Sequence, residues 1–67
     1  MLSPRESEIL SALGRGQSSK QIAKALDLSV RTVEAHRQNI KRKLELEGQA
    51  ELIKYAVERA RNDGASD

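Results

Sequence analysis

The stretch "SSKQIAKALDLSVRTVEAHRQNIKRKL", residues 18 to 44, contains two helical patterns separated by a very short turn. Ser18 can cap a helix over residues 19–26, and Ser29 can cap a second helix over residues 30–45. Because only two residues separate the first helix from the second cap, the two helices must cross steeply. The stretch therefore predicts a helix-turn-helix.

Two further helices flank this motif and give an all-α domain. One is expected over residues 4–14, where Ser3 can cap, and the other over residues 50–61. Apolar residues recur at three- and four-residue spacing in all four segments, as in helices that bury one face. The predicted fold is a four-helix bundle containing a helix-turn-helix, in one domain over residues 1–61. Residues 62–67 carry almost no apolar side chain and are expected to form a disordered tail.

The composition excludes several kinds of protein. A chain of 67 residues buries only about 60% of its unfolded surface and leaves no room for a large cleft. It has no cysteine, and its only histidine, His36, flanks an apolar stripe and is expected to pack there. Because no nucleophile has a base beside it, we expect neither an enzyme nor a bound cofactor or metal. No apolar run approaches the roughly 18 residues of a membrane span.

The net charge of +2 hides an uneven distribution. Residues 15–43 carry eight basic and two acidic side chains, a net charge of +6, whereas the rest of the chain carries −4. A basic middle suits a polyanion, although a solvated charged surface is the more common explanation of such a region. Tyr55 is the only aromatic residue, so unpaired bases have nothing to stack on and duplex DNA is favoured over unpaired RNA.

The polar side of the helix over residues 30–45 favours the nucleic-acid explanation. Val33, Ile40 and Leu44 form a narrow stripe toward the core, which leaves the opposite side exposed. In a helix-turn-helix, that side of the second helix enters the major groove. There a glutamate can accept from cytosine, a glutamine can bridge adenine, and an alanine can contact a thymine methyl. The candidate base-reading residues are Glu34, Ala35 and Gln38, and the later Lys41, Arg42 and Lys43 are expected to approach phosphates.

Both assignments have simpler alternatives. A carboxylate near phosphates is repelled unless it is paired, so Glu34 could instead orient Arg31 or Arg37 within the molecule. The run from Lys41 to Lys43 could be solvated helix surface. Within this run, Lys41 and Arg42 are the better candidates for phosphate contacts.

The chain as a whole resembles a known family. The segments "LSPRESEIL" (residues 2–10), "GQSSKQIAKALDLSVRTVEAHRQNIKRKL" (16–44) and "AELIKYAVERA" (50–60) are similar to the LuxR-type (GerE-like) DNA-binding domain at the C-terminus of many bacterial response regulators. The resemblance covers residues 2 to 61 and departs from the family at Asp27 and at the start of the last helix.

This resemblance implies roles for individual residues. The family's base-reading positions fall on Glu34, Ala35 and Gln38. Its backbone-contacting positions fall on Lys20, Thr32 and Lys41, with Arg37 as an addition. The resemblance also implies that the last helix contributes to dimerisation.

The apolar stripe of the last helix is wider than a three-helix core requires. Closure of the core explains most of such a stripe, whereas small residues would let a twin helix approach closely. The candidate dimerisation residues are Leu52, Ala56, Val57 and Ala60. A symmetric dimer would place its two recognition helices about 34 Å apart, one turn of DNA.

These observations predict sequence-specific binding of duplex DNA in bacterial transcription regulation, as a homodimer on DNA. RNA polymerase is a candidate second partner, and the expected location is the cytoplasm, at the nucleoid. One alternative is a promoter reader like region four of sigma factors, against which the long last helix argues. Another is a helical protein-interaction module whose basic face binds an acidic partner. Only the DNA-binding alternatives predict affinity for random duplex that falls linearly in log salt.

Overall fold

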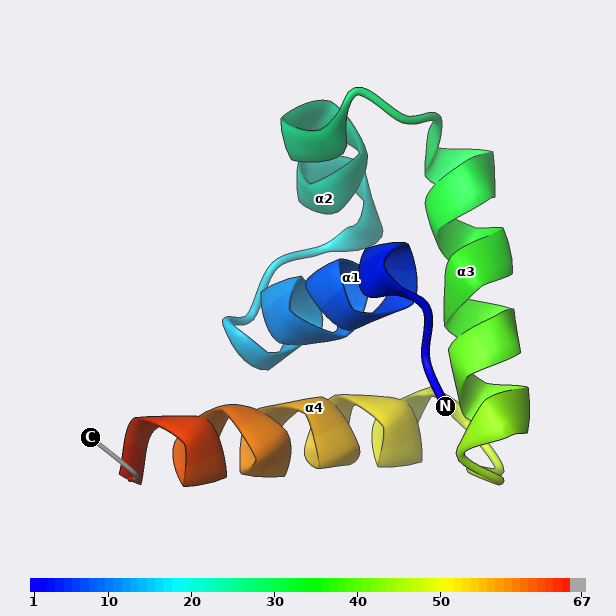
Figure 1. The fold of residues 1–67 in the computed structure, drawn as a ribbon. Helices are drawn as coiled ribbons and strands as arrows, with labels where there is room; N and C mark the ends of the chain where they lie inside the picture. The colour runs from blue at the N-terminus through cyan, green and yellow to red at the C-terminus, as the bar shows by residue number, and fades with distance from the viewer. Residues whose placement is uncertain (66–67) are drawn as a thin grey trace.

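The computed structural model describes residues 1–65 of the chain, and over this range it confirms the predicted all-α fold. It has four helices: α1 (Pro4–Gly14), α2 (Ser19–Leu26), α3 (Val30–Lys43) and α4 (Gln49–Ala65). In Figure 1, α1 lies in the middle, with α2 above it, α4 below it and α3 along the right-hand side. None of the helices within residues 1–65 is long and apolar enough to cross a membrane.

The first three helices begin at the serines that the sequence predicts. Ser3 and Ser18 each form a capping box, in which the serine hydroxyl accepts the backbone N–H of Glu6 or Gln21 and that residue's side chain accepts in return. Ser29 accepts the backbone N–H of Thr32 at 3.0 Å. Because these contacts span only three residues, the sequence alone is enough to place them.

A residue with a left-handed backbone follows each of these three helices. Gly16 has a φ of 86° after α1, Asp27 has a φ of 57° after α2, and Glu45 has a φ of 56° after α3. The sequence singles out Asp27 but gives no sign of Glu45, and the third helix ends two residues before the expected residue 45. The helix stops at Lys43, and the N–H of Glu45 turns back to the carbonyl of Arg42 at 3.2 Å.

The last helix extends at both ends of its predicted range. It starts at Gln49, one residue early, and Glu51 in its first turn accepts the backbone N–H of Glu47 at 2.8 Å. It continues to Ala65, so residues 62–65 of the expected tail are helical. Residues 66 and 67 of that tail lie outside the described residues.

The core forms where α1 meets the other helices. α1 packs against both α3 and α4, and α2 packs against α3. The larger side chains of the core are fully buried: Ile9, Leu10, Leu13, Ile22, Val33, Ile40 and Leu52. The predicted inward residues Leu26 and Leu44 are half-buried and pack against this cluster. The helix-turn-helix is therefore held in place through the contact between α3 and α1.

Gly14 allows α1 and α4 to approach each other closely. A Cβ atom at position 14 would lie 2.5 Å from the carbonyl oxygen of Ala56 and 3.1 Å from the Cβ of Ala60. Both neighbours belong to α4, and the nearer one is backbone. A side chain at position 14 would therefore force the two helices apart.

Candidate nucleic-acid interface

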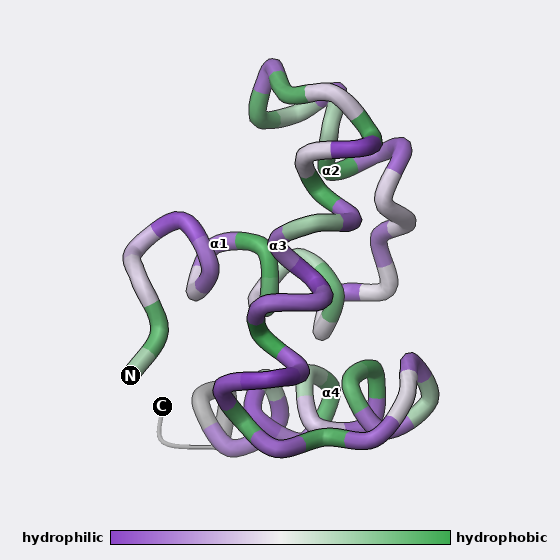
Figure 2. The backbone as a smooth tube through the Cα atoms, turned by 90° about the vertical axis from the view of Figure 1, so that its right-hand side faces the viewer, coloured by the Kyte–Doolittle hydropathy of each residue, from purple (hydrophilic) through white to green (hydrophobic). Residues whose placement is uncertain are grey.

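The outward face of α3 is exposed along its length. Val33 and Ile40 are fully buried on the inner side, whereas the residues of the opposite side are open to solvent. Figure 2 views this face directly, with α3 in front and mostly hydrophilic along its course. The exposed residues include all three base-reading candidates, Glu34, Ala35 and Gln38, together with Arg31 and Arg42.

The turn before α3 presents the start of this face. Only Asp27, Leu28 and Ser29 lie between α2 and α3. Asp27 is left-handed, which lets the chain reverse within this short turn, and Leu28 is half-buried against the core. Because the turn is anchored on both sides, the first turns of α3 project in a fixed direction from the domain.

The backbone-contact candidates differ in their freedom to move. Lys20 is exposed at the start of α2, and Arg42 is exposed near the end of α3, where it donates to Asn39 at 2.9 Å. The hydroxyl of Thr32 lies 2.9 Å from that of Ser29 at the cap of α3. Lys41 is half-buried. These four residues leave cationic or hydroxyl groups at both ends of the motif, as phosphate contacts require.

Glu34 is held by neighbours within the molecule. The hydroxyl of Ser19 donates to Glu34 Oε2, and Nη1 of Arg37 lies 3.7 Å from the same oxygen. Even so, 54% of the Glu34 side-chain surface remains exposed. Glu34 can therefore pair with Arg37 within the molecule and still present its carboxylate to the outside.

Arg37 differs from the other candidate backbone contacts. Only 13% of its side-chain surface is exposed. Nη1 donates to Ser19 Oγ at 2.7 Å, and Nη2 donates to Gln49 Oε1 at 2.6 Å. Sequence reasoning missed both Ser19 and Gln49, because these contacts join residues 18 and 12 positions apart.

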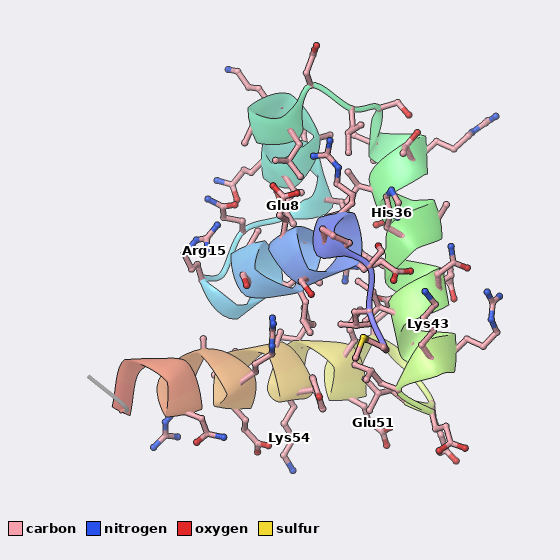
Figure 3. All side chains as sticks on the ribbon, in the orientation of Figure 1. Glu8, Arg15, His36, Lys43, Glu51 and Lys54 are labelled. Carbon is pink, nitrogen blue, oxygen red and sulfur yellow. The ribbon has the colours of Figure 1, made fainter. Side chains whose placement is uncertain are left out.

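Lys43 lies on the side of α3 that faces α1, away from the proposed phosphate contacts. Its Nζ donates to Glu6 Oε1 at 2.8 Å, and the same oxygen accepts the backbone N–H of Ser3. Figure 3 shows Lys43 on the lower part of α3. The hydrogen bond from Lys43, with that from Ser3, lowers the pKa of the buried Glu6 carboxyl to about 2. Lys43 thus links α3 to α1.

This ion pair predicts acid sensitivity. The pKa of Glu6 is about 2 in the folded state, compared with an ordinary value of 4.5 that applies to the unfolded chain. The ionised carboxylate therefore contributes its full stabilisation at pH values above 4.5. That contribution falls as the pH drops through 4.5 toward 2. We expect Glu6→Gln to be less stable than the wild type at pH 6 and to approach it near pH 2, as measured by urea unfolding at both pH values. The exposed Glu8→Gln is the control, and an equal deficit for Glu6→Gln at both pH values would contradict this account.

The candidate dimerisation residues differ in how deeply they are buried. Leu52 and Ala56 are fully buried in the core of the single chain, where their side chains pack inside the domain. Ala60 is half-buried beside Gly14 of α1. Val57 is 38% exposed, and Ile53, one turn earlier and absent from the predicted set, is 37% exposed. The apolar spacing of the sequence predicts which residues form the stripe on α4, but not which of them face the core.

Comparison with known proteins identifies a family for this chain. Residues 1–56 match the GerE model, described as bacterial regulatory proteins of the luxR family. The oxygen regulatory protein NreC of Staphylococcus carnosus is 46% identical over 59 residues, which cover 88% of this chain and 27% of that protein. NreC of Staphylococcus haemolyticus gives the same values. The chain thus spans about a quarter of the length of these relatives. No solved structure matches it significantly.

The family match and the arrangement of α2 and α3 both indicate a helix-turn-helix domain. The match covers all of the helix-turn-helix and α4 as far as Ala56. A domain of this family serves regulation by binding DNA and has no catalytic role. The chain belongs to the luxR family of bacterial regulatory proteins and is a DNA-binding domain of transcription regulation.

Proposed function

We propose that this domain recognises a specific site in duplex DNA by inserting α3 into the major groove. The observation that carries the proposal is the outward face of α3, where three side chains suited to base edges are exposed together beyond a tight turn. In this arrangement Glu34 accepts from a cytosine amino group, Gln38 pairs with adenine, and Ala35 contacts a thymine methyl. Lys20, Thr32, Lys41 and Arg42 contact phosphates on either side.

The proposed active form is a homodimer on DNA. Ile53 and Val57 lie one turn apart on α4, and both are partly exposed, which supports them as the contact between two copies. A two-fold arrangement would place the recognition helices about one turn of DNA apart. As part of a bacterial response regulator, such a dimer would work in the cytoplasm at the nucleoid. Bound at a promoter, it would lie beside RNA polymerase, its proposed second partner.

The test is selection from a pool of random duplexes at about physiological salt, with sequencing of the retained DNA. Enrichment of two short half-sites about one helical turn apart would support the proposal. Enrichment of a single half-site would contradict the dimer, and retention without enrichment would contradict base reading. No retention at all would contradict DNA binding and favour a protein-interaction module.

Two substitutions separate positioning contacts from base contacts. We expect Lys20→Ala to weaken binding to all sequences about equally, because a phosphate contact carries no sequence information. We expect Gln38→Ala to relax the preference at one base position by about 1 to 3 kcal/mol. Binding titrations against the selected site and its single-base variants measure both effects. A uniform loss from Gln38→Ala would contradict its assignment.

A further inference from the structure

Arg37 occupies a junction of three helices. It belongs to α3, it donates to Ser19 in the first turn of α2, and it donates to Gln49 at the start of α4. The hydroxyl of Ser19 in turn donates to Glu34. A continuous chain of hydrogen bonds therefore runs from the first residue of α4 to the carboxylate that is proposed to read a base.

The surroundings of Arg37 suit an internal role better than a phosphate contact. Its side chain is 13% exposed, and both terminal nitrogens already donate within the molecule. The remaining nitrogen, Nε, is buried without a hydrogen-bond partner among the described residues. Leaving a buried donor unpaired costs free energy, so this placement is maintained by the other contacts of the guanidinium. A residue that only neutralised phosphates would gain nothing from such burial.

Glu34 needs the support that this junction gives. A glutamate side chain rotates freely on an exposed helix face, and a carboxylate close to DNA phosphates is repelled by them. Arg37 places a positive charge 3.7 Å from Glu34 Oε2, and Ser19 fixes that oxygen with a hydrogen bond. Both contacts hold the carboxylate in one orientation before DNA arrives and offset part of the repulsion.

We infer that Arg37 is a positioning residue that sets the base preference of Glu34, and that Gln49 anchors Arg37 from α4. The inference rests on the proposed function, because it assumes that Glu34 faces a base. It assigns specificity to two residues that contact no DNA. It also makes the start of α4, the helix proposed to form the dimer, part of the recognition machinery.

The test compares Gln49→Ala with Asn62→Ala. Both variants remove a neutral amide from an exposed position of α4, but of these two amides it is that of Gln49 that accepts a hydrogen bond from Arg37. Each variant, the wild type and Glu34→Ala are passed through selection on random duplexes, and the base position that changes in Glu34→Ala identifies the site read by Glu34. At that position we expect Gln49→Ala to lower discrimination about fivefold, the lower end of what one base contact contributes. Asn62→Ala should match the wild type.

Arg37→Gln gives a second measurement, because it changes the charge. If Arg37 contacts a phosphate, this variant lowers the slope of log affinity against log salt by about one and keeps the base preference. If Arg37 positions Glu34, the slope stays the same and the preference at the Glu34 position falls. Unchanged preference in Gln49→Ala, or a reduced slope in Arg37→Gln, would overturn the inference. Failure of the proposed function itself would give a different result, because the wild type would then enrich no base in the selection on random duplexes.

Discussion

Replacement of Leu52 by alanine is expected to destabilise the domain by roughly 2 to 5 kcal/mol. Leu52 is fully buried, and truncation would remove apolar contacts and leave a cavity between α4 and α1. A domain of this size has only a few kcal/mol of stability, so the variant should be largely unfolded at 37 °C. Thermal and urea unfolding followed by circular dichroism would measure the loss.

Ile53→Ala is the matched control, because it changes a side chain of the same size at the next position. Ile53 is 37% exposed, and its truncation should cost about 1 kcal/mol or less. If the two variants lost equal stability, α4 would not be oriented as described. If Leu52→Ala folded normally but failed to dimerise on DNA, Leu52 would belong to the interface after all.

Gly14→Ala should also destabilise the fold, by about 2 kcal/mol. The added Cβ would lie 2.5 Å from a backbone carbonyl oxygen of α4, and a helix backbone cannot move aside as a flexible side chain can. Alanine is the better helix former by up to about 1 kcal/mol, but the overlap outweighs this gain. In a domain of this length, the melting temperature should fall by roughly 10 °C, measurable by calorimetry.

The control for this substitution is Gly48→Ala. Apart from Gly48 itself and its two chain neighbours, no residue has an atom within 4 Å of a Cβ built at Gly48, and its φ is not positive, so the same methyl group meets neither overlap nor backbone strain. A melting temperature close to that of the wild type is expected. Equal losses at positions 14 and 48 would show that the effect comes from the loss of glycine and not from the contact with α4.

The features that the sequence predicts correctly are local. Ser3, Ser18 and Ser29 cap helices through bonds to residues three positions away, and the apolar spacing gives four helices. The family resemblance, now confirmed, adds the helix-turn-helix and its DNA-binding role. The exposure of Glu34 and Gln38 follows from helical periodicity once the buried stripe of α3 is known.

The features that the sequence could not give depend on contacts between distant residues. Nothing local distinguishes Leu52 from Ile53, because both lie on one broad apolar stripe and only packing on α1 decides which is buried. A glutamate gives no sign of the left-handed backbone that ends α3. The burial of Arg37 likewise depends on Ser19 and Gln49, which no short-range pattern connects to it.

The central position of α1 has a consequence for how regulators of this design diversify. α1 packs against the recognition helix on one side and against α4 on the other. In the proposed dimer, the position of one recognition helix relative to its twin therefore depends on the packing of α1 in each copy, together with the contact between Arg37 and Gln49. The spacing between the DNA half-sites would then depend in part on the packing of α1, a helix for which no base contact is proposed. Substitutions that change how α1 packs on α3 and α4 would therefore change the preferred spacing between half-sites, while the outward face of α3 stays the same.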